Sequence, residues 1–327
     1  MSASERRPTR PAPEGEGRRV LVTGATGFIG RQLLHMLVEA GLDVHAVTSR
    51  DTPDGRELVT WHRADLLDGA SIPDLCATVQ ANDLLHVAWD TTPGAYTRTP
   101  RNLDWLAASL QLARSFVEHG GTRIVGAGTC FEYAHQAAPC REGSTPLEPD
   151  TLYGTSKVAL QRVLACYADE AGISCAWGRI FFLYGPHEHP DRLVSSVTRS
   201  LLAGREAACS VGTQIRDFLH VADVAAALVA LLRSDVTGPV NIASGTPLTI
   251  RDLVLEIGEQ IGRRDLVQLG ALPLSPRDPP HVVADVTRLR DEVGFTPRFS
   301  LAAGIEDTVR WWSNEGHDAS PARSTRP

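Results

Sequence analysis

The stretch Val20-Leu21-Val22-Thr23-Gly24-Ala25-Thr26-Gly27-Phe28-Ile29-Gly30 decides the fold of this chain. An aliphatic run that ends at Thr23 predicts a buried strand. Glycines follow with the spacing G-x-x-G-x-x-G, and apolar residues then recur at helical spacing as far as Ala40. A turn this tight requires residues without a Cβ atom, and backbone N–H groups at a helix N-terminus attract phosphate. The stretch therefore predicts a strand–turn–helix unit that holds a nucleotide; an ordinary glycine-rich turn is the alternative.

The composition predicts a globular protein without nucleic-acid or membrane partners. The chain has 327 residues, of which 43% are hydrophobic and 22% charged, and this suits one large α/β unit or about two domains. The net charge of −7 disfavours nucleic acid and anionic membranes. No apolar run reaches the length of about 18 residues that a membrane-spanning helix needs.

The N-terminus and the cysteines predict a cytoplasmic protein. Residues 1–19 are rich in Pro, Arg, Glu and Ser and lack an apolar core, which predicts a disordered leader rather than a secretory signal. The six cysteines form no C-x-x-C pair, so we expect reduced thiols, no disulfide and no metal site.

Predicted strands and helices alternate along the first half of the chain. After the first unit, strands are expected at 44–47, 59–66, 83–88 and 123–127, with a helix from Asn102 to about Val117. Alternation at intervals of about 25–30 residues predicts a parallel, doubly wound α/β sheet, whose carboxyl edge faces the ligand.

The end of the second predicted strand indicates the cofactor. NAD-binding units usually carry an acidic residue there to bind the ribose 2′-hydroxyl, whereas this chain has Thr48-Ser49-Arg50. Hydroxyl groups and an arginine suit a 2′-phosphate, so we predict NADP (as NADPH). Asp51, one residue further on, keeps NAD as an alternative.

Tyr153 and Lys157 are the strongest candidates for catalysis. They are four residues apart near the start of a predicted helix, so their side chains share one face. Lys157 is the single lysine of the chain, beside 31 arginines. A nearby ammonium favours phenolate, so we expect a lowered pKa that makes Tyr153 a usable acid or base. Thr129, after the fifth predicted strand, could donate to the same substrate oxygen; a structural Tyr–Lys pair is the alternative.

Five segments in this order resemble the extended short-chain dehydrogenase/reductases, a family of nucleotide-sugar epimerases, dehydratases and reductases. The resemblance covers roughly residues 18–313, and its segments are 23–30, 153–157, 184–186, 216–224 and 241–245. It implies that Thr129, Tyr153 and Lys157 form the catalytic triad and that the protein is a homodimer. The predicted cofactor-binding residues are Gly24, Thr26, Gly27, Phe28, Ile29, Ser49, Arg50, Asp65, Leu66, Val87, Ala88, Tyr153 and Lys157.

The resemblance also implies four substrate-side residues. Arg216 matches an arginine that binds the diphosphate of the sugar nucleotide, with a surface ion pair to Asp217 or Asp223 as the alternative. Arg277 lies where another substrate arginine often occurs. Phe182 stands where many members have an asparagine that faces the phosphates. Asn102 matches the asparagine that supports the active-site helix, with a polar helix start as the alternative.

Departures from the family pattern narrow the reaction. The 4,6-dehydratases carry an Asp-Glu pair directly after the catalytic threonine, where this chain has Cys130 and Phe131, so we reject dehydratase activity. Glu132 is expected to face elsewhere. The 3,5-epimerase/reductases need a histidine where Arg192 stands, although His187 and His189 keep that option open.

These expectations combine into one hypothesis, NADPH-dependent reduction of the C4 keto group of a nucleotide-linked, dTDP-type 4-keto-6-deoxyhexose in deoxysugar or antibiotic biosynthesis. A nucleotide-sugar 4-epimerase with tightly bound NAD and a non-catalytic NADP-binding protein are the alternatives. The expected fold is a Rossmann sheet with a smaller, discontinuous α/β substrate domain. The predicted boundaries are a disordered leader at 1–17, the NADP-binding domain at 18–180 and 213–247, the substrate domain at 181–212 and 248–314, and a disordered tail at 315–327.

Overall fold

The computed structural model describes residues 17–52, 58–275 and 278–315. Arg277 and nearly all of the predicted leader and tail lie outside the described residues. Within those ranges, no helix is both long enough and apolar enough to cross a membrane.

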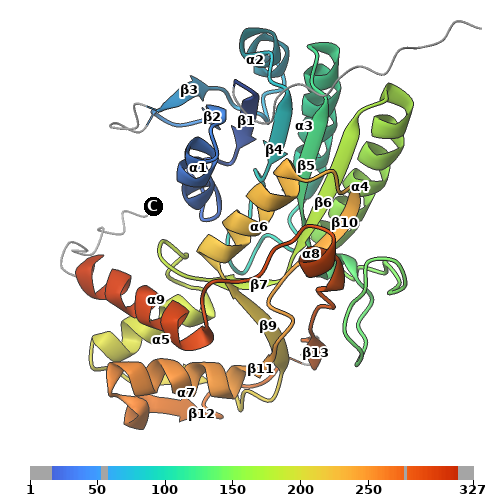
Figure 1. The fold of residues 1–327 in the computed structure, drawn as a ribbon. Coiled ribbons are helices and arrows are strands. Elements are labelled where there is room, and N and C mark those ends of the chain that lie inside the picture. Colours follow the sequence, from blue (N-terminus) through green and yellow to red (C-terminus); the bar gives the residue numbers. More distant parts are fainter. Residues whose placement is uncertain (1–16, 53–57, 276–277, 316–327) are drawn as a thin grey trace, which may run out of the picture.

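A seven-stranded parallel sheet forms the centre of the larger part of the molecule (Figure 1). Its strands follow the order β10-β6-β5-β4-β1-β2-β3, and every neighbouring pair is parallel. The predicted doubly wound α/β fold is therefore confirmed. The strand bounds are β1 (Arg19–Thr23), β2 (Asp43–Thr48), β3 (Val59–Arg63), β4 (Asp83–His86), β5 (Arg123–Thr129), β6 (Ser174–Ile180) and β10 (Gly238–Ile242).

Helices cover both faces of this sheet, because successive side chains of a strand point to opposite faces. Val20 and Val22 of β1 pack in one core cluster with α1 and α6, whereas Leu21 packs in the other with α2, α3 and α4. The helix bounds are α1 (Gly30–Glu39), α2 (Ser71–Val79), α3 (Arg101–Glu118), α4 (Leu152–Ala171) and α6 (Val221–Arg233).

Smaller sheets and further helices form the lower part of Figure 1. Strand β9 (Ile215–His220) lies between β11 (Pro247–Thr249) and β13 (His281–Val282) and also pairs with β7 (Phe182–Tyr184). A separate core cluster unites α5 (Leu193–Leu202), α7 (Ile250–Ile261) and α9 (Leu301–Glu315) with β8 (Ala207–Cys209) and β12 (Val267–Leu269). Short helices are η1 (Cys130–Glu132), η2 (Arg264–Leu266) and α8 (Thr287–Asp291). The exact division into two domains stays a prediction.

Candidate active site

The glycine turn after β1 has the geometry of a cradle for a dinucleotide. Gly24 has φ +68°, and a Cβ atom there would lie 2.8 Å from the backbone nitrogen of Ala88. A Cβ atom at Gly30 would lie 2.1 Å from the carbonyl oxygen of Gly24. No side chain caps the N-terminus of α1. The turn thus brings Gly24 against Val87 and Ala88 and leaves the helix end open to a phosphate, so these residues fit the predicted cofactor.

The other predicted residues of the turn lie at its surface. Gly27 is exposed, whereas Thr26, Phe28 and Ile29 are half-buried. Arg31, which the sequence analysis did not single out, donates from Nε to the carbonyl oxygen of Thr26 at 3.1 Å.

The residues predicted to choose between NADP and NAD lie at the end of β2. Ser49 and Arg50 are both exposed directly after the strand. The carboxylate of Asp51 is 98% exposed and lies 3.5 Å from the guanidinium of Arg63. Asp51, Ser49 and Arg50 are therefore all accessible to a ligand at this corner.

Of the two predicted cofactor-binding residues after β3, one is exposed and the other is buried. Asp65 is exposed, and its carboxylate accepts the N–H of Leu67 at 3.0 Å. Leu66 is buried and lines a pocket of about 340 Å³ next to α3, together with Gln111.

The structure brings Thr129, Tyr153 and Lys157 together. Thr129 ends β5, and its side chain lies near enough to the Tyr153 phenol to lower the pKa of that phenol. Thr151 caps α4 by accepting the N–H of Gly154 at 3.1 Å, which sets the direction of the helix. One turn further along α4, Nζ of Lys157 donates to the carbonyl oxygen of Ala127 at 2.8 Å. All three side chains are buried.

The expected low pKa of Tyr153 is wrong for this structure. Burial raises the pKa of the phenol, Tyr96 adds to that effect, and the side chain of Thr129 only partly opposes it. The ammonium of Lys157 lies 5.9 Å from the centroid of the Tyr153 ring, too far for its charge to outweigh desolvation. Tyr153 is consequently a protonated phenol at neutral pH.

Lys157 has an unusual environment for a lysine. Burial lowers its pKa to about 7, and the charge of Glu132 opposes this shift. Nζ lies 3.8 Å from the centroid of the Trp89 ring. His86 is nearby, but burial, reinforced by the charge of Lys157, lowers the histidine pKa to about 3.

A chain of hydrogen bonds keeps His86 neutral and fixes its tautomer. The N–H of Ala88 donates to Thr23 Oγ1 at 3.2 Å, and that hydroxyl lies 2.7 Å from His86 Nδ1. The hydroxyl of Ser109 donates to the carbonyl oxygen of Trp105, so it accepts from His86 Nε2, 2.8 Å away. We therefore assign the Nε2–H tautomer.

Glu132 is the residue whose position the sequence analysis missed. It is fully buried and accepts the N–H of Thr129 and the indole N–H of Trp177, each at 2.9 Å. Arg179 donates to its other oxygen at 2.6 Å. Thr129 and Glu132 form a capping box around η1, and the T-x-x-E spacing is the signal that could have revealed it.

The two positions that carry carboxylates in dehydratases hold no carboxylate acid/base pair here. Burial raises the pKa of Cys130 above its ordinary value, so this thiol stays protonated. Phe131 presents an aromatic ring 6.4 Å from the ring of Tyr153.

Arg216 and Phe182 lie together on β9 and β7. The guanidinium is 5.2 Å from the centroid of the Phe182 ring and pairs with Asp278 at 2.5 Å. The alternative expectation, a surface ion pair of Arg216 with Asp217 or Asp223, is therefore wrong. Asp217 instead accepts the backbone N–H groups of Ser244 and Gly245. Asp223 accepts the backbone N–H groups of Arg298 and Phe299. The pairing differs because Asp278 reaches β9 from the segment before β13.

Phe131 connects this substrate side to the triad. Its ring lies 6.2 Å from that of Phe182 and 6.4 Å from that of Tyr153. Aromatic side chains therefore run from Arg216 to the predicted proton donor.

Asn102 supports a loop rather than α4 directly. Its amide donates to the carbonyl oxygens of Tyr96 and Thr99, and its own carbonyl accepts the indole N–H of Trp89 at 2.8 Å. The side chain is buried, and these three bonds tie down the segment that precedes α3.

The 89–97 segment, which lies between β4 and α3, forms a wall of the site. The Tyr96 ring meets that of Tyr153 edge-on at 5.0 Å. The guanidinium of Arg192, the residue at the histidine position of the epimerase/reductases, lies 5.1 Å from the Tyr96 ring and donates to the carbonyl oxygen of Thr91. The N–H of Tyr153 donates to the carbonyl oxygen of Thr97 at 3.0 Å.

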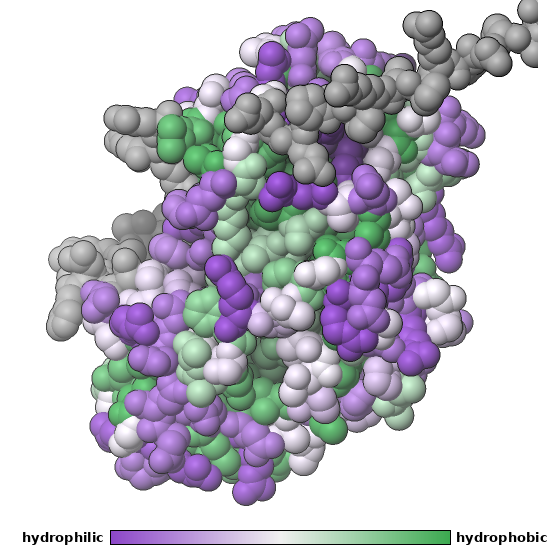
Figure 2. All heavy atoms as spheres, in the orientation of Figure 1, coloured by the Kyte–Doolittle hydropathy of each residue, from purple (hydrophilic) through white to green (hydrophobic). Residues whose placement is uncertain are grey.

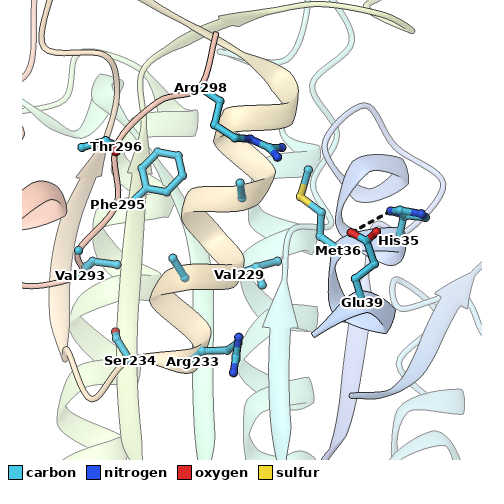
Figure 3. A pocket seen from close by; sticks show the side chains of 13 residues that line it. His35, Met36, Glu39, Val229, Arg233, Ser234, Val293, Phe295, Thr296 and Arg298 are labelled. Carbon is cyan, nitrogen blue, oxygen red and sulfur yellow. Dashed lines mark ion pairs between the residues drawn. The ribbon is translucent and has the colours of Figure 1, made fainter. Parts of the chain in front are cut away.

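A large surface groove lies elsewhere. In Figure 2, less polar side chains gather near the middle of the face where Figure 1 places α6 beside α1. A groove of about 900 Å³ runs between these helices and the 293–298 segment, and Figure 3 shows His35 and Glu39 of α1 paired at its rim, 3.3 Å apart. None of the predicted site residues lines it.

Comparisons with known proteins agree with this arrangement. The family model described as "NAD dependent epimerase/dehydratase family" matches residues 20–243. The dTDP-glucose 4,6-dehydratase of Streptomyces antibioticus is 28% identical, with 90% of this chain and 92% of that protein covered. The UDP-glucose 4-epimerase of Azospirillum brasilense is 27% identical, with 90% and 91% covered. The solved structure of MoeE5 in complex with UDP-glucuronic acid and NAD has a TM-score of 0.78 at 29% identity, with 91% and 99% covered.

Proposed function

This chain belongs to the NAD dependent epimerase/dehydratase family, and from that premise we propose that it is a reductase of nucleotide-linked 4-keto sugars. The resemblance to the extended short-chain dehydrogenase/reductases is confirmed by the same match. The proposed reaction is the NADPH-dependent reduction of the C4 carbonyl of a dTDP-linked 4-keto-6-deoxyhexose.

The observation that carries the proposal is the buried set of Thr129, Tyr153 and Lys157 with Cys130 and Phe131, and no carboxylate, directly after the threonine. A reductase needs a group that gives a proton to the developing alkoxide, whereas an epimerase must first remove a proton from a hydroxyl group. Burial of Tyr153 supports the acid form. Phe131 and the protonated thiol of Cys130 supply no carboxylate for the elimination of water.

The residues of the site have separable tasks in this proposal. A bound nicotinamide supplies the hydride. Tyr153 donates its phenolic proton to the carbonyl oxygen, and the hydroxyl of Thr129 orients that oxygen. Lys157, which donates to Ala127 in this structure, stabilises the phenolate that remains after the proton has left. The aromatic rings of Tyr96 and Phe131 exclude water from the phenol.

The cofactor and substrate assignments follow from charge. Ser49 and Arg50 offer a hydroxyl and a cation to a 2′-phosphate, and the glycine turn offers the open end of α1 to the diphosphate. Arg216 is proposed to bind the diphosphate of the sugar nucleotide in exchange for Asp278.

A homodimer is part of the proposal. Leu103 on α3 and Val163 on α4 are exposed at 54% and 47%, although these two helices pack against each other. Apolar side chains exposed on adjacent helices suit burial against a second copy. Size-exclusion chromatography with light scattering tests this part.

A 4-epimerase with tightly bound NAD is the second candidate. The similarity to UDP-glucose 4-epimerases and to NAD-containing MoeE5 favours it. The intact Tyr153 and Lys157 argue against the third candidate, a non-catalytic NADP-binding protein, because no reaction would require them.

One experiment separates these candidates. The purified protein is incubated with dTDP- and UDP-linked 4-keto-6-deoxyhexoses and NADPH, and the loss of nicotinamide absorbance is followed. We expect stoichiometric oxidation of NADPH and a reduced sugar. Stoichiometric NAD in the purified protein, together with interconversion of 4-epimers without added cofactor, would establish the epimerase instead.

A further inference from the structure

The ammonium of Lys157 is held between a carbonyl oxygen and the face of an indole ring. Nζ donates to Ala127 at 2.8 Å and lies 3.8 Å from the centroid of the Trp89 ring, and the residue is 2% exposed. We propose that Trp89 is a positioning residue whose ring face fixes the Lys157 ammonium beside Tyr153. The inference rests on the proposed function only in assigning Lys157 to catalysis.

Trp89 is itself rigidly held, as a positioning residue must be. Its indole N–H donates to Asn102, whose amide in turn holds the backbone of Tyr96 and Thr99. The ring of Trp105 stacks on it at 6.1 Å. The ring of Tyr153 meets it edge-on at 6.2 Å, so one indole contacts both members of the predicted Tyr–Lys pair.

Other charges around Lys157 do not replace this contact. Glu132 of η1 raises the lysine pKa, but its carboxylate is already bound by Arg179. His86 of β4 is neutral, and Tyr153 of α4 is a protonated phenol. Among the described residues, no carboxylate lies within ion-pair distance of Nζ. An indole face attracts a desolvated cation through its quadrupole, so Trp89 stabilises the charged form where no anion does.

Because Lys157 is the only lysine, its side chain can be observed alone. Protein grown on lysine labelled with ¹³C at Cε gives one methylene signal in a ¹H–¹³C spectrum. In the wild type we expect this signal to be shifted upfield by the indole ring current. It should titrate near pH 7, because burial lowers the lysine pKa to about 7.

Replacement of the ring tests the contact without any assay of activity. In Trp89→Leu we expect most of the ring-current shift to disappear and the titration midpoint to fall by about one pH unit, because the charged form loses its nearer π partner. The Trp177 ring, whose centroid lies 5.7 Å from Nζ, remains in this variant. Trp89→Phe keeps an aromatic face, so its ring-current shift and titration midpoint should lie between those of the wild type and Trp89→Leu. This second variant still tests the contact if Trp89→Leu folds poorly.

Trp312→Leu is the matched control. It removes an indole that lies over Arg199, 5.2 Å from the guanidinium, and should leave the lysine signal unchanged. The proposal is overturned if Trp89→Leu alters the lysine shift and midpoint no more than Trp312→Leu does.

The results distinguish a failure of the proposed function from a failure of the positioning role of Trp89. If the lysine spectrum behaves as expected but the wild-type enzyme reduces no 4-keto sugar, the reductase assignment fails and the positioning role stands. If the enzyme is active and the lysine spectrum ignores residue 89, the positioning role fails alone. When both hold, Trp89→Phe should lower kcat more than it changes KM for the sugar nucleotide.

Discussion

The carboxylate of Glu132 and the guanidinium of Arg179 meet 2.6 Å apart directly beneath the predicted triad, with side chains 0% and 1% exposed. The same carboxylate accepts the backbone N–H of Thr129, so one ion pair joins the end of β5 to β6 at the point where the substrate carbonyl is expected. Arg179 also donates to the hydroxyl of Tyr133, which completes its set of buried partners.

Glu132→Gln should destabilise the fold strongly, because it leaves a buried arginine without its counter-charge. Breaking a buried pair in this way costs about 3–5 kcal/mol of unfolding free energy. Urea unfolding measures the loss. Glu118→Gln is the control, since it breaks the exposed Arg114–Glu118 pair of 2.8 Å and should cost far less. Similar losses in both variants would contradict the structural role of Glu132.

Tyr153→Phe should lower kcat for 4-keto sugar reduction by about 10²–10⁴-fold, because the proton donor is removed. Thermal unfolding should change little, since the ring remains. Tyr167→Phe, a half-buried tyrosine further along α4, serves as the control and should keep full activity. Undiminished turnover in Tyr153→Phe would exclude the phenol as the acid.

Arg50→Ala should reduce the preference for NADPH over NADH by about tenfold or more, because hydrogen bonds to a charged phosphate are worth about 1.5–3 kcal/mol. The measurement is kcat/KM for each cofactor. Asp51→Asn should leave the ratio unchanged, since the proposal gives Asp51 no contact with the ribose or its phosphate. A lower kcat/KM for NADH in Asp51→Asn, together with an unchanged cofactor preference in Arg50→Ala, would assign the site to NAD.

Arg216→Ala should weaken the binding of dTDP or UDP by about tenfold or more through loss of a charge-assisted contact. Asp278→Asn should have the opposite effect, because the guanidinium no longer has a competing carboxylate. Titration calorimetry gives both affinities, and the exposed Arg251→Ala is the control. Unchanged affinity in Arg216→Ala would place the diphosphate elsewhere.

Glu188 should contribute a fall in stability as the pH rises from about 4.5 to about 7, whereas buried His86, whose pKa is lowered to about 3, contributes in the opposite direction below its ordinary pKa. Burial raises the pKa of Glu188 to about 7 from 4.5, although Ser195 donates to it. In this window the unfolded carboxyl group has lost its proton and the folded one has not, so the unfolded state binds fewer protons and stability declines.

Glu188→Gln should remove this contribution, so that its change in stability over this pH range differs from that of the wild type by on the order of 3 kcal/mol, because the amide carries no titrating proton. Urea unfolding at pH 4.5 and pH 7.5 measures the difference. Glu206→Gln, at an exposed position, should leave the slope as it is. A wild-type slope that persists in Glu188→Gln would assign the effect to other groups.

Local sequence alone determined the parts of this protein that depend on spacing along the chain. The three glycines after β1 predicted a turn that only residues without a Cβ atom can form, and the contacts of Gly24 and Gly30 agree. The alternation of strands and helices predicted the parallel sheet. A separation of four positions between Tyr153 and Lys157 placed both on one face of α4, because a helix repeats every 3.6 residues.

Tertiary structure alone decided what surrounds those residues. The partner of Arg216 is 62 residues away, that of Glu132 is 47 residues away, and the ring over Lys157 comes from a loop after β4. The protonated state of Tyr153 likewise depends on how many elements bury it, and burial reversed the expected direction of its pKa. Desolvation and long-range pairing depend on how distant elements pack together, and the spacing of neighbouring residues carries no information about that packing.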